Sequence, residues 1–79
     1  MSAPPLRAVL SGGAAVELTA TAEEAARLRA DAAKGRAYLA QSTATTGLAR
    51  EGDAVIRALC DEKDEMAAAI EAHVAGVAP

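Results

Sequence analysis

The chain is almost free of aromatic side chains: Tyr38 is its single aromatic residue, and tryptophan and phenylalanine are absent. Aromatic rings bury the largest area per side chain, so a core built without them must rely on smaller aliphatic groups. A single tyrosine also argues against a platform on which successive nucleic-acid bases stack. We expect Tyr38 to be a packing or dimer-contact residue.

Cysteine and long apolar runs are also scarce. Cys60 is the single cysteine, so it cannot form a disulfide within the chain, and nothing in the sequence indicates an oxidising compartment. We expect Cys60 to act as a small hydrophobic residue. No run approaches the roughly 18 apolar residues of a membrane span, and residues 1–10 do not fit a signal peptide. The sequence therefore predicts a cytoplasmic protein.

Basic charge is in short supply. Eight lysines and arginines face eleven acidic residues, which gives a net charge of −3. This balance argues against general nucleic-acid binding through neutralised phosphates. Residues 1–60 carry seven basic and six acidic side chains, whereas residues 61–79 carry one basic and five acidic ones. The acidic end could meet the chain's own basic end or attract a basic partner.

Alanine is what the chain has in abundance, at 23 of 79 residues. Alanine favours helix because its side chain loses no entropy there, but it buries little surface. A chain of this length has room for one domain, and small domains often complete a thin core by self-association. We therefore expect a small, mainly helical protein that forms a homo-oligomer.

The first twenty residues do not have a helical pattern. Residues 1–5 contain two prolines and predict an extended tail. Two short runs of alternating residues flank the glycine pair of residues 11–13, which predicts a β-hairpin over residues 6–20. The alternative is a single edge strand preceded by irregular chain.

A first helix is predicted for residues 22–41. Thr21 and Glu24 fit a capping box, in which the threonine hydroxyl accepts from an amide of the first turn and the glutamate reaches back. Apolar residues then recur at helical spacing. Gly35 interrupts them at a cost of about 1 kcal/mol relative to alanine, but it would let a neighbouring backbone approach closely.

A second helix is predicted for residues 48–75, after a threonine-rich turn at residues 42–47. Gly76 provides a natural stop. The apolar stripe of this helix consists of Leu48, Gly52, Val55, Ile56, Leu59, Met66, Ile70 and Val74.

Two long helices joined by a short turn should pack antiparallel. The sequence thus predicts a mainly α fold, an antiparallel two-helix hairpin with a short N-terminal β-hairpin or strand, completed by oligomerisation. Residues 6–79 would form this single domain. The apolar stripe of the second helix is longer than the first helix that packs against it. We therefore expect the C-terminal half of the second helix to contact another chain.

Three features with polar or glycine residues fall short of a catalytic or metal site. The acids at 61–65 lack the turn glycine and alternating ligands of a calcium loop. His73 follows Glu71 by two residues, whereas a helical metal site needs a spacing of three. Residues 11–13 lack the lysine and hydroxyl residue of a phosphate loop. We expect no enzyme, no cofactor and no metal.

Residues 53–59, Asp-Ala-Val-Ile-Arg-Ala-Leu, resemble the second helix of ribbon-helix-helix antitoxins. Those proteins dimerise through an N-terminal strand, bind operator DNA with that ribbon and neutralise a toxin with a C-terminal helix. The resemblance implies a DNA-binding transcriptional regulator. Base reading uses Arg, Lys, Asn or Gln, whereas the outward residues of the best strand candidate are Glu17 and Thr19.

Residues 16–21, Val-Glu-Leu-Thr-Ala-Thr, lead into a helix and look similar to the hairpin-to-helix passage of phage head-to-tail joining proteins of the W type. This resemblance implies a small virion assembly protein. The N-terminal helix of that family has no counterpart in this sequence.

From the residues themselves we expect a non-enzymatic protein–protein interaction module: an adaptor, assembly subunit or protein inhibitor. Its partner would be a second copy, another protein or both, with no membrane and no small-molecule substrate. An aliphatic helix face would supply the affinity, and an acidic cluster would set partner choice and encounter rate. The predicted contact residues are Val55, Ile56, Leu59, Met66, Ile70 and Val74, and the acidic cluster is Asp61, Glu62, Asp64 and Glu65.

Overall fold

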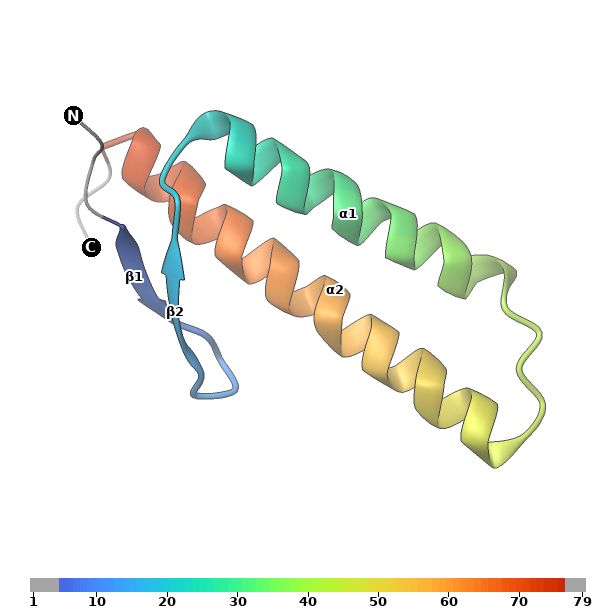
Figure 1. The fold of residues 1–79 in the computed structure, drawn as a ribbon. Helices are drawn as coiled ribbons and strands as arrows, with labels where there is room; N and C mark the ends of the chain where they lie inside the picture. The colour runs from blue at the N-terminus through green and yellow to red at the C-terminus, as the bar shows by residue number, and fades with distance from the viewer. Residues whose placement is uncertain (1–4, 77–79) are drawn as a thin grey trace.

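The computed structural model describes residues 5–76, which form a β-hairpin followed by a helical hairpin (Figure 1). The two helices lie antiparallel, and the molecule is elongated, at 49 × 23 × 21 Å. The mainly helical fold predicted from the sequence is confirmed. The elements are β1 (Leu6–Val9), β2 (Ala15–Leu18), α1 (Ala22–Gln41) and α2 (Gly47–Val74).

The predicted N-terminal tail lies outside the described residues except for Pro5, which is exposed. Within the described range, no helix combines the length and the apolarity needed to cross a membrane.

The hairpin predicted for residues 6–20 is confirmed, and the alternative of a single edge strand is wrong. The strands pair antiparallel along their whole length, from Leu6 opposite Leu18 to Val9 opposite Ala15. Side chains alternate between the helices and solvent along each strand, as the pleat of a strand requires. The hairpin therefore has one apolar face to place against the helices.

The turn of the hairpin depends on a glycine. The Gly13 amide donates to the Leu10 carbonyl at 2.8 Å, and the Leu10 amide donates to the Ala14 carbonyl at 2.9 Å. Gly13 has a φ of +91°, which is the left-handed position that a three-residue hairpin loop needs. Glycine adopts it without the steric cost that a Cβ would bring.

The start of α1 is where the sequence predicted it, with one difference in the cap. The Thr21 hydroxyl accepts from the Glu24 amide at 3.2 Å, as predicted. The Glu24 carboxylate, however, pairs with Arg27 instead of reaching back. The Thr21 amide donates to the Thr19 carbonyl at 2.9 Å. A charged guanidinium one turn away is a stronger partner for a carboxylate than a neutral amide, so the reciprocal half of the capping box does not form.

The second helix is displaced by one residue from the prediction. It begins at Gly47 because Thr46 is its N-cap: the Thr46 hydroxyl accepts from the Ala49 amide at 3.1 Å. The helix ends at Val74, and Gly76 follows with a φ of +75°, as expected of a glycine just past a helix end.

The core lies where the β-hairpin crosses the helix pair. It consists of Leu18 from β2, Ala25 and Leu28 from α1, and Ala67 and Ile70 from α2. Ile70 is the largest fully buried side chain. The sequence predicted that the C-terminal half of α2 is shared with another chain. That prediction is wrong for Ile70, because the chain's own hairpin supplies the cover.

At Gly35 the two helices leave no room for a larger side chain. A methyl group added at Gly35 would overlap the sulfur of Cys60, which is buried. The sequence predicted that a neighbouring backbone approaches Gly35, whereas the structure places the Cys60 side chain in that space. Cys60 packs in the helix interface as the small hydrophobic residue that the sequence predicted.

Candidate functional site

Part of the apolar stripe on α2 faces solvent. Leu48 is 81% exposed, Val55 59% and Leu59 51%. These residues are seven and four positions apart, so they lie on one face of the helix. We call these three residues the uncovered stripe. They form a row of large aliphatic side chains that the chain itself leaves in water.

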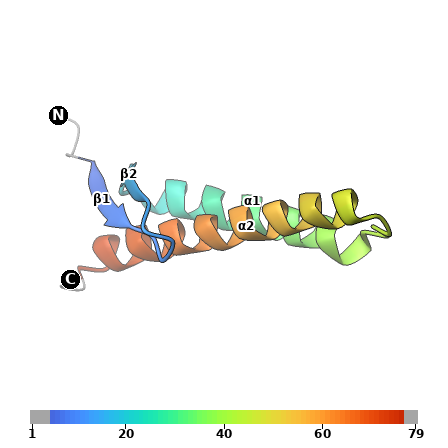
Figure 2. The same ribbon diagram turned by 90° about the horizontal axis from the view of Figure 1, so that it is seen from below.

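The uncovered stripe continues into the core. Met66 and Ile70 follow Leu59 by seven and eleven residues, which places them on the same face, and both belong to the region where the hairpin packs. Figures 1 and 2 show why the cover stops there: the hairpin lies at the end of the helix pair where α1 begins and α2 ends. The remainder of α2 extends beyond it toward the helix–helix linker.

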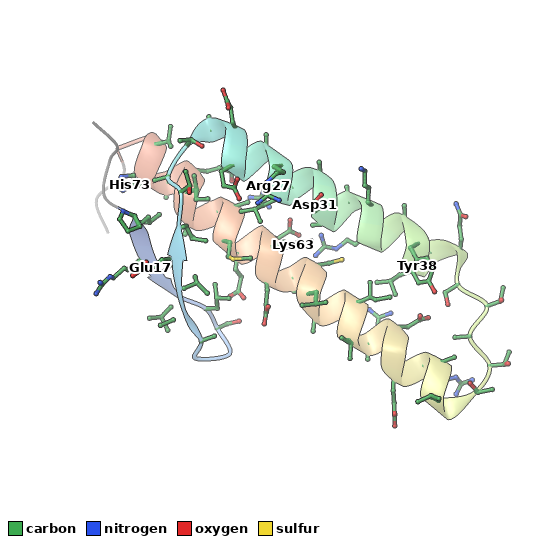
Figure 3. All side chains as sticks on the ribbon, in the orientation of Figure 1. Glu17, Arg27, Asp31, Tyr38, Lys63 and His73 are labelled. Atoms are coloured by element: carbon green, nitrogen blue, oxygen red, sulfur yellow. The ribbon has the colours of Figure 1, made fainter. Side chains whose placement is uncertain are left out.

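A shallow hollow of about 490 Å³ lies near the uncovered stripe at the linker end. Its lining includes Tyr38 from α1, Gly52 and Ile56 from α2, and the linker residues 42–46. Tyr38 is 58% exposed and extends from α1 toward α2 (Figure 3). The hollow therefore joins residues of α1, α2 and the linker, and its lining mixes apolar side chains with threonines and Asp53.

The six predicted contact residues differ in their exposure. Val55, Leu59 and Val74 are exposed, Ile56 and Met66 are half-buried, and Ile70 is buried. Val74 lies at the other end of the molecule, near Ala22 and Ala25. Ile70 has no exposed surface, so it holds the chain's own fold together. Leu48, which was not among the predicted contacts, is the most exposed large aliphatic residue of α2.

Two residues of the predicted acidic cluster pair with arginines of α1. Arg36 contacts both Asp61, at 2.8 Å, and Asp64. Arg29 contacts Asp64 at 3.2 Å and Glu71 at 2.6 Å. Asp64 thus lies between two guanidinium groups. These carboxylates bridge the two helices, so much of the cluster's charge is used within the chain.

The ion pairs shift the titration of their members. Hydrogen bonds from Arg36 hold the pKa of the Asp64 carboxyl below its ordinary value, and Arg29 adds to that effect. Hydrogen bonds from Arg29 lower the pKa of Glu71 in the same way. Both carboxylates are partly solvated, so water screens the pairs and each one contributes modestly to stability.

The other two acids of the cluster differ from each other. Glu65 accepts a hydrogen bond from the Ser11 amide at 3.0 Å and so ties the hairpin turn to α2. Glu62 is exposed and lies one turn beyond Leu59, beside the uncovered stripe. Of the four acids, Glu62 is therefore the one best placed to meet a partner there.

The sequence contained a signal for the interhelical ion pairs that its interpretation missed. Arg29 and Arg36 are seven residues apart, as are Asp64 and Glu71, so each pair forms a row on one helix face. In an antiparallel hairpin these two rows can face each other. The acids were interpreted on their own helix alone, which left out the cations across the interface.

A second group of ion pairs links the helices near the middle of the molecule. Asp31 of α1 contacts Lys63 of α2 at 3.7 Å and Arg27 of its own helix at 3.4 Å (Figure 3). Asp31 and Lys63 are therefore paired with each other across the helix interface.

Within residues 5–76, no three histidine, cysteine or acidic side chains come together in a way that could hold a metal ion. His73 lies in the last turn of α2, where a cationic side chain interacts favourably with the helix dipole.

Comparison of the chain with models of known protein families, with curated proteins and with solved structures gives no match.

Proposed function

We propose that this chain is a non-enzymatic protein–protein interaction module, an adaptor, assembly subunit or protein inhibitor, that binds through the uncovered stripe. The observation that carries the proposal is the exposure of Leu48, Val55 and Leu59 on one helix face. A helix of a soluble protein normally turns such a face toward the core. Contiguous exposed apolar surface is typical of a site that another protein covers.

The spacing of the stripe favours a helical partner. Leu48, Val55 and Leu59 recur at the intervals by which one helix anchors against another. Tyr38 and Ile56 lie in the adjoining hollow, and a tyrosine there offers a large apolar ring together with a polar hydroxyl. A partner helix could pack along the uncovered stripe and place a side chain in the hollow.

The acidic side chains have a smaller part in this proposal than the sequence suggested. Asp61 and Asp64 are engaged with arginines of the same chain, whereas Glu51 and Glu62 are exposed near the stripe. Peripheral charges of this kind change the rate of encounter more than the final affinity. We therefore assign the affinity to the uncovered stripe and the steering to Glu51 and Glu62.

A capture experiment with matched variants tests the proposal. The immobilised full-length chain is exposed to an extract of its native host, and the wild type is compared with Leu59→Asp and with the control Val9→Asp. Val9 is 75% exposed on the hairpin, away from the stripe. Leu59→Asp should reduce capture of a specific protein at least about tenfold, and Val9→Asp should not. Equal capture by both variants, each folded by circular dichroism, would contradict the proposal.

DNA binding of the antitoxin kind remains the alternative function. The ribbon-helix-helix resemblance implies a strand paired between two protomers, whereas β1 pairs here with β2 of the same chain. On the solvent-facing side of the hairpin, Arg7 contacts Glu17 at 3.5 Å, so its charge is partly neutralised. We expect no salt-dependent retention of DNA in a gel-shift assay at low salt; clear retention would favour this alternative.

A further inference from the structure

The uncovered stripe has the spacing of a coiled-coil seam. Leu48, Gly52, Val55 and Leu59 follow one another at intervals of four, three and four residues, which is the a/d pattern that places one helix against another. The same spacing continues through Glu62 to Met66. The hairpin covers the Met66 end, so the open part of the seam runs from Leu48 to Leu59.

No described element of the chain can cover this open part. The opposite side of α2 already packs on α1 through Cys60 and Ala67, which are buried. The hairpin is joined to α1 by residues 19–21 alone, and that short connection holds it at the far end of the helix pair (Figure 2). A helix that completes the seam is therefore not among the described elements of this chain.

We propose that this helix is α2 of a second copy of the chain, antiparallel to the first, with a two-fold axis midway between Gly52 and Val55. This inference rests on the proposed function and names its partner. The axis sets Leu48 of one copy opposite the partner's Leu59, and Gly52 opposite the partner's Val55. In each of these facing pairs, a residue at an a position of one helix meets a residue at a d position of the other, as antiparallel packing of two seams requires.

Gly52 gives the proposed pairing its fit. Among the described residues, nothing lies within 4 Å of where a Cβ on Gly52 would be. Two helices can approach closely at such a position, because no side chain holds them apart. The Val55 side chain of each copy would fill the space above the partner's Gly52. The two-fold axis makes these two contacts equivalent, so the same surface fits itself.

Charge also favours the antiparallel arrangement. It brings Glu62 of one copy to the amino end of the partner's α2, which begins after Thr46 and has no acidic residue in its first turn. A carboxylate there is stabilised by the positive end of the helix dipole. A parallel pairing would instead put Glu62 opposite itself at a seam position and would stack one β-hairpin on the other.

The open seam is short, which sets the strength of the expected association. Leu48 to Leu59 spans about 17 Å of helix at 1.5 Å per residue. Even with Tyr38 and Ile56 beside it, such an interface is at the small end of the range for specific complexes. We therefore expect a reversible dimer that forms in the micromolar range and dissociates on dilution.

Sedimentation of the full chain, from low micromolar to near-millimolar concentration, tests the dimer. The wild type should move from monomer to dimer, and Leu59→Asp should weaken the association at least about tenfold because it places a charge in the seam. Val9→Asp should behave as the wild type. A wild type that stays monomeric throughout, or dimers that Leu59→Asp leaves unchanged, would overturn the pairing.

Cross-linking tests the orientation. In a Cys60→Ala background, one protein carries Leu48→Cys and another carries Leu59→Cys. An antiparallel seam predicts disulfide-linked dimers in the mixture and few in either protein alone, because only a Leu48 position meets a Leu59 position. Efficient cross-linking of each protein by itself would overturn the antiparallel arrangement.

The outcomes separate this inference from the function on which it rests. A monomeric chain whose capture of a different protein depends on Leu59 would reject the second copy as the partner and retain the interaction module. A dimer with the predicted cross-links supports both. Loss of both self-association and Leu59-dependent capture would reject both.

Discussion

The Cys60 side chain fills the space beside Gly35, where the two helices meet. The Cys60 sulfur lies where a Cβ on Gly35 would be, so these two positions share one space. Glycine in a helix interior is unfavourable by about 1 kcal/mol relative to alanine. Its presence here is explained by the tertiary contact and not by the helix it belongs to.

This contact gives a prediction at the residue scale. Gly35→Ala should lower the free energy of unfolding by about 1–3 kcal/mol, because overpacking outweighs the gain in helix propensity. Gly35→Ala combined with Cys60→Ala should recover most of that loss, since the second change removes the overlapping sulfur. Urea unfolding followed by circular dichroism measures both.

Gly52→Ala is the matched control, because nothing among the described residues lies within 4 Å of that position. It should stabilise the dilute chain by up to about 1 kcal/mol. If Gly35→Ala stabilised the chain to the same extent as Gly52→Ala, the tight contact would not exist.

Between elements, the arginine–carboxylate pairs fix which faces of α1 and α2 meet. Arg29 and Arg36 reach across to Asp61, Asp64 and Glu71. A shift of one helix turn would separate these pairs as well as the Gly35–Cys60 contact. Each pair is partly exposed and individually weak, so they specify the register of the helices more than they stabilise them.

The lowered pKa values of Asp64 and Glu71 predict how stability depends on pH. Their folded-state pKa values lie below the ordinary 3.8 and 4.5. The stabilisation is therefore complete above those ordinary values and is lost as pH falls through the lowered ones. The melting temperature should fall as the pH is lowered from about 6 to about 3.

Asp64→Asn should flatten this acid dependence, because it removes the carboxylate that lies between Arg29 and Arg36. Glu62→Gln serves as the control, since Glu62 is exposed beside the uncovered stripe. Thermal melts followed by circular dichroism across that pH range give the comparison. An Asp64→Asn profile as steep as that of the wild type would show that these pairs do not contribute.

At the scale of the whole molecule, the fold has two layers at one end and one layer at the other. The β-hairpin makes the second layer, and it covers α2 around Met66 and Ile70. Beyond it, α1 and α2 continue as a bare pair toward the linker (Figure 1). The chain thus covers one half of its long helix and leaves large aliphatic side chains of the other half exposed.

Two substitutions on α2 distinguish the halves. Ile70→Asp should unfold the monomer, because a buried, unpaired charge costs several kcal/mol and small domains have little stability in reserve. Val74→Asp, at a position that is 51% exposed, should leave the fold intact. Far-ultraviolet circular dichroism at low concentration measures this. A folded Ile70→Asp monomer would show that the hairpin does not cover α2 as described.

Much of the fold could be predicted because its signals are local. The Thr21 cap, the helical spacing of α1 and the glycine-rich turn each depend on a few neighbouring residues, and all three were found. Thr46 was missed as a cap because the threonines around it made the whole segment resemble a turn. The predicted contact residues were harder, since one apolar stripe contains both Ile70, in the core, and Leu59, which faces solvent.

The sequence by itself determined the two helices, the hairpin and their order, because propensity, capping and turn chemistry act between residues close along the chain. The tertiary structure alone decided which half of the α2 stripe is buried and which acids are neutralised. Burial of the stripe depends on where the hairpin crosses α2, and neutralisation of the acids depends on which arginines of α1 face α2. Such contacts join residues far apart in the chain, and the periodicity of a single helix contains no record of them.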